Sequence, residues 1–320
     1  MRKRLICKRA LSLLLCLLLS CSVPAASCFA DPADQAASAE AEETLPLHYY
    51  KHSPITTEYR SDNDDLIVLA EYTCASALNR GTNHLIVLGN LSGETLSVSS
   101  NTLMIDHDGN VITAQKCETP VVLKHGDIGV LAECSDRTSP AEIGHYFTKI
   151  SSAKSEQIPC PEAVGIRYDA TPYGIVAYAE NTLGTEITAA GYGVFFRDGR
   201  AVGGGELDFG DIHPFDISFD EIAIGEAYDE IVFFAYGFDN DASDRDVLSG
   251  AARSDDEAFQ EMRAYAKGFE EGRKVAQSYE RAAAIYSKLS EKGDTEAEKR
   301  LDELAEAGLI AVKEDRKSVV

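Results

Sequence analysis

Asp208, Asp211 and Asp216 are the residues whose type and spacing could support acid–base chemistry. Two carboxylates held roughly 5 to 10 Å apart in a cleft can cleave a glycosidic bond, and a cell-wall glycan-acting enzyme is therefore one hypothesis for this chain. The seven histidines are scattered, and the sequence contains no zinc-protease spacing, no nucleophile elbow and no phosphate-binding loop. We therefore favour a protein with no catalytic residues, no cofactor and no enzymatic activity.

Cysteine is the second residue type that could react. Four of the eight cysteines lie in the first 30 residues. The other four are Cys74, Cys117, Cys134 and Cys160. Residues 111–134 are typical of two strands that turn at 124–127, which would place Cys117 opposite Cys134 and leave Cys74 to pair with Cys160. Metal binding is the competing hypothesis, but no Cys-x-x-Cys spacing occurs. Two disulfide bonds are the prediction, because an exported chain meets an oxidising environment.

Two acidic stretches raise the question of calcium. Residues 106–110 read Asp-His-Asp-Gly-Asn, but the later acidic ligand of an EF-hand is missing. Residues 239–246 are equally acidic and lack the glycine and the terminal glutamate of such a loop. A hairpin turn and a solvated linker are the preferred interpretations, and no metal ligand is predicted. A calcium-dependent adhesin or spacer remains an alternative, and it requires that calcium raise the melting temperature.

The N-terminus has the order of a secretory signal. Five basic residues between positions 2 and 9 precede the leucine-rich run 11–19 and a small-residue stretch that ends at Ala30. We predict a signal peptide over 1–30. Residues 18–21 resemble the lipoprotein box, in which Cys21 would be acylated. Release by cleavage, a lipid anchor on Cys21 and retention as an uncleaved anchor are all open, and the apolar run is shorter than the roughly 20 residues of a comfortable membrane span.

Charge narrows the choice of partner. The chain carries 53 acidic and 30 basic side chains, a formal net charge of −23. Such a surface repels phosphate backbones and anionic headgroups, so nucleic acid is excluded as a partner, and contact with a membrane is expected only through the signal or lipid anchor. A protein or a cell-wall ligand is the expected partner. The acidic residues also serve the solubility of an exported protein.

One pattern occurs twice in the chain. Asn90-Leu91-Ser92-Gly93 returns as Asn181-Thr182-Leu183-Gly184, and Asp108-Gly109 returns as Asp198-Gly199, at offsets of 90 or 91 positions. One structural unit used twice explains this spacing. Turns are the predicted role of these residues, since tight turns need the positive φ angles that Gly, Asn and Asp tolerate best. The turn residues of the repeat are Asn90, Gly93, Gly109, Asn181, Gly184 and Gly199.

Short β-branched and aromatic runs flank these turns. Gly, Asn and Asp separate the runs at the spacing of a β-sandwich, and each set spans about the 100 residues expected for an immunoglobulin-like domain. The predicted divisions are a disordered or lead-in segment over 31–62, sandwiches over 63–158 and 159–240, a linker over 241–253, a helical region over 254–312 and a tail over 313–320.

The second copy carries a family resemblance. Residues 195–202 read Phe-Phe-Arg-Asp-Gly-Arg-Ala-Val, and Tyr228-Asp229-Glu230-Ile231 precedes the final aromatic strand. Together with the strand pattern, these motifs resemble the bacterial FxLYD-type immunoglobulin-like domains of exported and lipid-anchored proteins, and residues 104–109 of the first copy match more weakly. The resemblance covers about 66–239. It implies an extracytoplasmic accessory or binding module and assigns neither a ligand nor an active site.

Helical spacing begins after the linker. Ser254-Asp255-Asp256-Glu257 is a capping box, and apolar residues recur every three or four positions from Phe259 onward. Residues 279–308 resemble one Sel1-like or tetratricopeptide-like helical hairpin. Because stacked arrays of such hairpins need about three units, we expect this copy to pack on another part of the protein.

The prediction is thus a mainly β protein with two tandem immunoglobulin-like sandwiches and a C-terminal helical region. We expect it to be secreted or displayed at the cell surface as a non-enzymatic cell-envelope interaction or accessory module.

Overall fold

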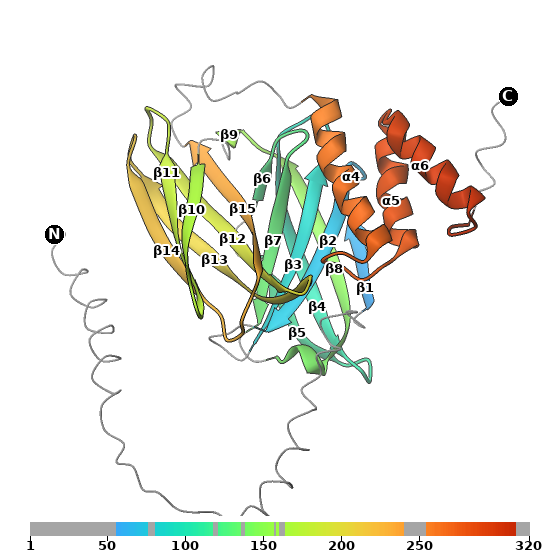
Figure 1. Ribbon diagram of the computed structural model, residues 1–320, viewed down its shortest axis with the longest axis horizontal. Coiled ribbons are helices and arrows are strands. Elements are labelled where there is room, and N and C mark those ends of the chain that lie inside the picture. Colours follow the sequence, from blue (N-terminus) through green and yellow to red (C-terminus); the bar gives the residue numbers. More distant parts are fainter. Residues whose placement is uncertain are drawn as a thin grey trace, which may run out of the picture. The chain divides into compact units, whose positions relative to one another are not determined.

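A computed structural model describes residues 56–75, 81–117, 121–135, 138–156, 158–159, 164–239 and 254–311 (Figure 1). Within these residues the protein is mainly β, with a helical region at the C-terminal end, as predicted. The signal segment with Cys21, Cys160, the linker 241–253 and the tail 313–320 lie outside the described residues.

The first half of the chain forms two sheets, sheet A and sheet B. Sheet A has the order β1-β8-β4-β5, and β6 also pairs with β4; sheet B has the order β2-β3-β7. Their strands are β1 (Thr56–Ser61), β2 (Leu66–Ala75), β3 (Thr82–Asn90), β4 (Leu96–Asp106), β5 (Val111–Lys116), β6 (Val121–Leu123), β7 (Ile128–Ser135) and β8 (Ile143–Lys154), with a 3-10 turn η1 (Pro140–Glu142) before β8. Ile86 and Leu131 of sheet B pack with Val98 and Ile150 of sheet A, which makes a sandwich. The strand β1 lies in the segment predicted as a lead-in and pairs in parallel with β8.

The second half also forms two sheets. Sheet C has the order β13-β12-β15-β9, and sheet D has the order β10-β11-β14. Their strands are β9 (Ile158–Pro159), β10 (Val164–Thr171), β11 (Gly174–Asn181), β12 (Ile187–Arg197), β13 (Arg200–Ile212), β14 (Ile217–Ala223) and β15 (Glu230–Asp239). Ile175 and Ala177 of sheet D pack against Phe195 and Leu207 of sheet C.

The two sandwiches share one strand order. If β5 and β6 together correspond to β13, the strand order of sheet A matches that of sheet C, and the order of sheet B matches that of sheet D. The edge strands differ in direction, since β1 is parallel to β8 and β9 is antiparallel to β15. The repeated sequence pattern therefore marks a repeated fold.

Asn90 and Asn181 occupy the same position in the two units. Each is fully buried at the end of the central strand of its three-stranded sheet. The Asn90 amide donates to the carbonyls of Glu94 (2.8 Å) and Leu123 (2.9 Å), while its Oδ1 accepts from the Ser92 N–H (2.9 Å). The amide of Asn181 donates likewise to Thr185 (2.8 Å) and Ile212 (3.0 Å), and its Oδ1 accepts from Leu183 (2.9 Å). One side chain thus satisfies the backbone of two loops in each sandwich.

The repeated glycines behave less uniformly. Gly93, Gly109 and Gly199 have φ angles of 73°, 88° and 72°, which a β-carbon disfavours. Gly184 does not have a positive φ; a β-carbon there would lie 4.0 Å from the ring of Phe215, whose own φ is 58°.

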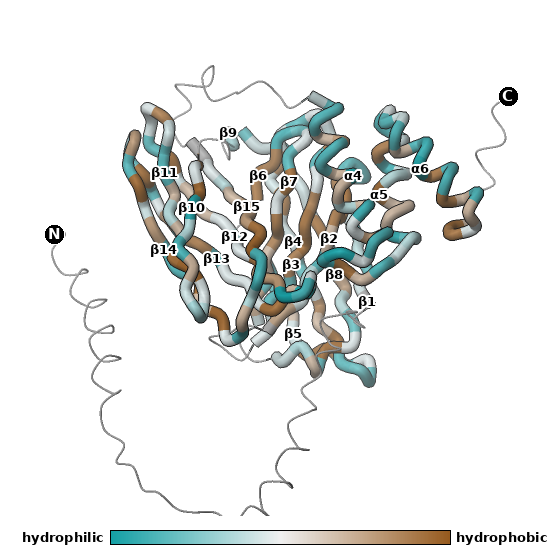
Figure 2. Tube along the Cα trace, viewed as in Figure 1, coloured by the Kyte–Doolittle hydropathy of each residue, from teal (hydrophilic) through white to brown (hydrophobic). Residues whose placement is uncertain are grey.

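Strand β3 is buried along its whole length, because sheet B is covered on both faces. Even-numbered residues such as Ile86 face sheet A. Leu85 and Val87 face a second core, built with Val194 of sheet C and Met262 of the helical region. Figure 2 is brown along much of β2 and β3. The two sandwiches are therefore joined through a common core, which the division into separate domains did not anticipate.

Direct hydrogen bonds cross this core. The Asn83 amide donates to the Gly204 carbonyl (2.9 Å), and the Tyr236 hydroxyl donates to the Val130 carbonyl (2.7 Å). Gly203 to Gly205 lie in the regular ladder of β13 just after the bulge between Phe195 and Phe196. The side chains of Ile224 and Ile222 fill the space where the β-carbons of Gly203 and Gly205 would stand, whereas a β-carbon on Gly204 would meet the Gly193 carbonyl and Tyr192 of β12.

Three helices follow, α4 (Asp255–Glu271), α5 (Tyr279–Glu291) and α6 (Thr295–Glu306). The capping box predicted at Ser254 and Glu257 is formed, and α4 ends at Gly272, whose φ is 65°. The predicted apolar stripe of α4 is buried against sheet B. Gly89 allows this close approach, since a β-carbon there would lie 2.6 Å from Met262 Cε. Of the helices described, none combines the length and the apolar character that a membrane span requires.

Candidate functional site

Titratable groups with displaced pKa values gather around His84, a residue of β3 with no exposed surface. Its Nδ1 lies 3.1 Å from Glu133 Oε2, and its Nε2 lies 3.0 Å from Glu71 Oε1. The ring stacks on Tyr146 with centroids 4.0 Å apart and planes 5° from parallel. We call His84, Glu71, Glu133 and Arg281 the charge cluster. It lies between sheets A and B, because His84 shares the sheet A side of β3 with Ile86.

Neighbouring charges and hydrogen bonds shift the pKa values of His84 and Glu71. Burial alone would lower the pKa of His84, but the hydrogen bonds and charges of Glu133 and Glu71 raise it to about 9. Burial would raise the pKa of Glu71, but His84, Arg281 and the Thr57 hydroxyl lower it to about 2. At neutral pH His84 is therefore an imidazolium that donates one hydrogen bond to each glutamate.

The cluster connects every layer of the first sandwich to the helices. Ser100 of β4 donates to Glu133 (2.6 Å), and Thr57 of β1 donates to Glu71. Arg281 of α5 approaches the second oxygen of Glu71 at 3.3 Å. The Glu71 side chain is only 5% exposed, whereas that of Arg281 is 42% exposed. Arg281 is the one side chain of the charge cluster that is substantially exposed to solvent. The cluster therefore links sheet A, sheet B and α5 inside the protein and offers no surface to which a substrate could bind.

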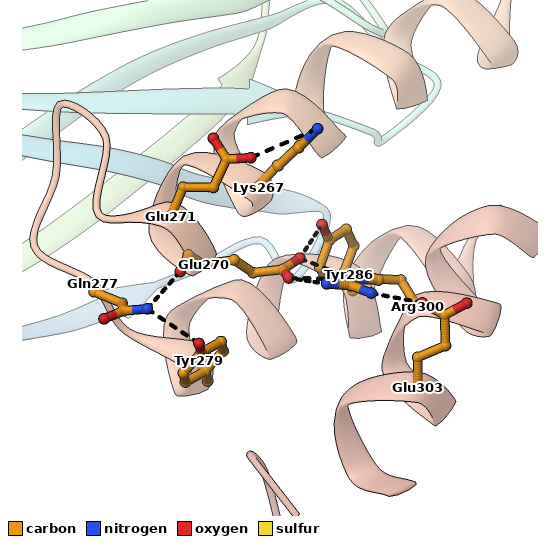
Figure 3. A network of polar contacts seen from close by, with 8 residues as sticks. All are labelled: Lys267, Glu270, Glu271, Gln277, Tyr279, Tyr286, Arg300 and Glu303. Atoms are coloured by element: carbon orange, nitrogen blue, oxygen red, sulfur yellow. Dashed lines mark hydrogen bonds and ion pairs between the residues drawn. The ribbon is translucent and has the colours of Figure 1, made fainter. Parts of the chain in front are cut away.

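A second polar network lies within the helical region (Figure 3). The buried carboxylate of Glu270 in α4 accepts from the Tyr286 hydroxyl of α5 (2.7 Å) and from the Arg300 guanidinium of α6. The Gln277 amide donates to the Glu270 carbonyl (2.7 Å). Burial opposes the charged form of the Glu270 carboxylate, but the hydrogen bonds from Arg300 and Tyr286 lower its pKa. One glutamate thus holds three helices together.

The outer side of sheet D exposes large apolar side chains on neighbouring positions. Residues paired directly across an antiparallel ladder point to the same side of the sheet. Tyr178 of β11 is paired with Arg167 of β10 and with Phe219 of β14. Phe219 is 70% exposed, and its neighbour on the same side, Ile217, is 44% exposed. We call the outward side chains of these strands the sheet D face: Arg167, Asp169, Val176, Tyr178, Ile217 and Phe219.

The carboxylates weighed for glycan hydrolysis are all exposed. Asp208 and Asp211 lie on β13, the edge strand of sheet C, and Asp216 lies in the turn before β14. Asp211 accepts from the Thr188 hydroxyl (2.7 Å), and Asp208 and Asp216 accept from backbone N–H groups of Gly210 and Ile217. Each carboxylate therefore serves a local contact.

The acidic loop at 106–110 forms the hairpin turn between β4 and β5. Asp106 Oδ1 accepts from the N–H groups of Asp108 (2.9 Å) and Asn110 (2.7 Å), and its pKa is lowered chiefly by the hydrogen bond from the Asn110 side chain. Over the described residues, no group of three or more His, Cys, Asp and Glu side chains is arranged to hold a metal ion.

The cysteines are not placed as the pairing prediction supposed. Cys117 follows β5 and its N–H donates to the Ser100 carbonyl of β4 in sheet A, whereas Cys134 lies on β7 of sheet B. No disulfide joins Cys74, Cys117 and Cys134 to one another. Cys74 and Cys134 instead flank Asn83 across sheet B, with the Tyr192 hydroxyl 3.9 Å from Cys134 Sγ. The pairing of Cys74 with Cys160 is not tested, because Cys160 lies outside the described residues.

Sequence reasoning missed the charge cluster and the sheet D face. The signal for the cluster was a charged residue inside an apolar strand, as at Glu71, His84 and Glu133. The signal for the face was aromatic and aliphatic residues on the outward positions of two paired strands, which becomes readable only once the register is known.

No family model and no curated protein matches this chain. Among solved structures, it is similar to Cj0090 of Campylobacter jejuni, at 12% identity over 31% of this chain and 98% of that one, with a TM-score of 0.23. Red sea bream transglutaminase is similar at 6% identity over 54% of this chain and 29% of that one, with a TM-score of 0.20. The C-terminal globular domain of an oligosaccharyltransferase from Pyrococcus abyssi is similar at 8% identity over 55% of this chain and 47% of that one, with a TM-score of 0.18. The chain covers less than half of the length of the transglutaminase and of the oligosaccharyltransferase domain. Similarities at TM-scores this low carry no argument about function.

Proposed function

We propose that this protein is an exported bacterial cell-envelope module of the FxLYD-like type that works by binding and not by catalysis. The observation that carries the proposal is the sheet D face, where Phe219 and Ile217 are exposed side by side with Tyr178. Exposed apolar patches with a polar rim mark interaction sites on soluble proteins.

Two further features support the proposal. The signal-like order of residues 1–30 favours export. The charge cluster ties the first sandwich to α5 with paired charges, which suits a rigid scaffold that presents a binding surface.

Envelope association tests the proposal directly. The full chain is expressed in a bacterial host, the envelope is fractionated, and the intact mass of the protein is measured in each fraction. Lipidation at Cys21 would add a diacylglyceryl mass that Cys21→Ala removes, whereas release by cleavage would give a mass beginning near Asp31.

Binding through the face is tested with purified protein and isolated cell envelopes in a sedimentation assay. We expect the wild-type protein to sediment with envelopes and Phe219→Ser to remain largely in solution. Tyr173→Ser is the matched control, because Tyr173 is 73% exposed but lies in the β10–β11 turn. A cytoplasmic protein, or equal sedimentation of all three proteins, would contradict the proposal.

A further inference from the structure

The sheet D face is an aromatic surface as well as an apolar one. The rings of Tyr178 and Phe219 lie with centroids 6.4 Å apart and planes tilted by 45°. Ile217 and Val176 extend the apolar area along the same side of the sheet. Such rings present their negative π faces to an approaching ligand.

Carboxylates border the rings. Asp169 accepts a hydrogen bond from the Tyr178 hydroxyl (3.1 Å), Glu180 is paired with Ile217, and Glu221 follows Phe219 on the same side of β14. Over residues 164–239 the chain contains 14 acidic residues, three arginines and no lysine. The second sandwich therefore attracts cations and repels a second copy of itself.

Arg167 shows that the face accepts a guanidinium. Its Cζ lies 5.7 Å from the centroid of the Tyr178 ring, within the range of a cation–π interaction. The exposed ring of Phe219 has no such cation among the interactions of the described residues. A partner that supplied one would complete the pattern.

We infer that the sheet D face binds a basic protein segment, which places an arginine or lysine side chain over Phe219, beside the Tyr178 ring that Arg167 covers, and further cationic side chains next to Asp169, Glu180 and Glu221. The aliphatic stems of those side chains cover Ile217 and Val176, as long cationic side chains do on apolar surfaces. The inference rests on the proposed binding function and names the chemistry of its partner.

Fluorescence anisotropy with a labelled synthetic peptide tests the inference. The probe is a short peptide of alternating arginine and threonine with one central leucine, and its counterpart has glutamate in place of arginine. We expect the wild-type full chain to bind the arginine peptide and not the glutamate peptide, with an affinity that falls as salt is raised. Phe219→Ser should weaken binding about tenfold or more, as expected when a central aromatic contact is removed.

Variants that each remove one carboxylate test whether the peptide binds at the sheet D face or is attracted only by the net negative charge of the protein. Glu221→Gln removes a carboxylate that borders the sheet D face on β14 and should weaken binding, whereas Glu226→Gln removes an exposed carboxylate outside the sheet D strands and should not. Tyr173→Ser should bind as the wild type does. Unfolding midpoints of all variants are compared, so that loss of binding is not mistaken for loss of fold.

Other results would overturn the inference. Equal binding by the wild type and Phe219→Ser, with the same weakening in Glu221→Gln and Glu226→Gln, would mean attraction by net charge alone. Binding of a neutral cell-wall glycan that Phe219→Ser abolishes would assign the face to carbohydrate, and a dimer in light scattering would assign it to a second copy. If the wild type sediments with envelopes through this face but ignores the peptide, the inference fails while the proposed function stands.

Discussion

The imidazole of His84 and the carboxylate of Glu71 lie 3.0 Å apart inside the first sandwich, where neither side chain is more than 5% exposed. A second carboxylate, that of Glu133, holds the other ring nitrogen, and Arg281 holds the outer side of Glu71. Two positive and two negative groups balance one another. Because His84, Glu71 and Glu133 are buried together, loss of any one of these three leaves an uncompensated buried charge.

Replacing His84 should therefore be costly. His84→Leu leaves Glu71 and Glu133 buried without their common donor, and we expect the free energy of unfolding to fall by about 3 to 5 kcal/mol. Urea denaturation of the purified protein measures this change. His213→Leu is the control, because its partner Glu186 and His213 itself are at least half exposed. A fall of less than 1 kcal/mol for His84→Leu would show that the cluster does not stabilise the fold.

The cluster should also give stability a defined dependence on pH. The pKa of His84 is about 9 when folded and 6.5 in the reference state, so its contribution is complete below pH 6.5 and is lost as pH rises towards 9. The pKa of Glu71 is about 2 against 4.5, so its contribution is complete above pH 4.5 and is lost as pH falls towards 2. Urea midpoints measured across this range should show a plateau between about pH 4.5 and 6.5.

The variant His84→Gln tests whether deprotonation of His84 causes the loss of stability above pH 6.5. In His84→Gln the decline between pH 6.5 and 9 should flatten, since no group remains at position 84 to lose a proton. An unchanged alkaline decline in this variant would assign it to another residue.

Arg281 should matter more for the position of α5 than for global stability. Its side chain is 42% exposed, so the ion pair with Glu71 is partly screened, and Arg281→Met should cost about 1 kcal/mol or less. Amide hydrogen exchange should nevertheless accelerate in α5. Lys288→Met is the matched control, because its ion pair with Glu291 is formed within α5. Equal exchange in the two variants would argue against a tie between α5 and sheet B.

Local features of this fold were predictable, because they depend on neighbours in the chain. The spacing of Asn90 and Asn181 marked the duplicated unit, and Ser254 marked the start of α4. The charge cluster joins positions 71, 84, 133 and 281, and no periodicity relates residues that meet only through folding. The pairing of Cys117 with Cys134 assumed that β6 and β7 share a sheet, but the chain crosses between sheets at that turn.

The two asparagines of the repeat should be equally sensitive to substitution. The buried amide of Asn90 donates to two carbonyls and that of Asn181 to three, and Asn90→Ala or Asn181→Ala should lower the free energy of unfolding by about 2 to 3 kcal/mol. Asn→Asp keeps the acceptor but turns a carboxylate oxygen towards those carbonyls, so it should cost more than Asn→Ala at neutral pH. Urea denaturation of the four variants checks both statements. A large fall in the free energy of unfolding at only one of the two positions would contradict the prediction. It would mean that the same hydrogen-bond geometry stabilises the two sandwiches to different extents.

The thiol of Cys74 should be unreactive in the folded protein. Its side chain is fully buried, and burial raises its pKa to about 12, so little of the nucleophilic thiolate forms at pH 8. Iodoacetamide should leave Cys74 unmodified in the native state, as measured by mass spectrometry of the peptide that carries it. The same labelling is repeated on protein unfolded in urea without a reductant. Modification of Cys74 there would mean that its thiol is reduced. If Cys74 is modified only after a reductant is added, the result would support the predicted disulfide bond to Cys160. Rapid modification of the native protein would contradict the burial of Cys74 between the two sandwiches.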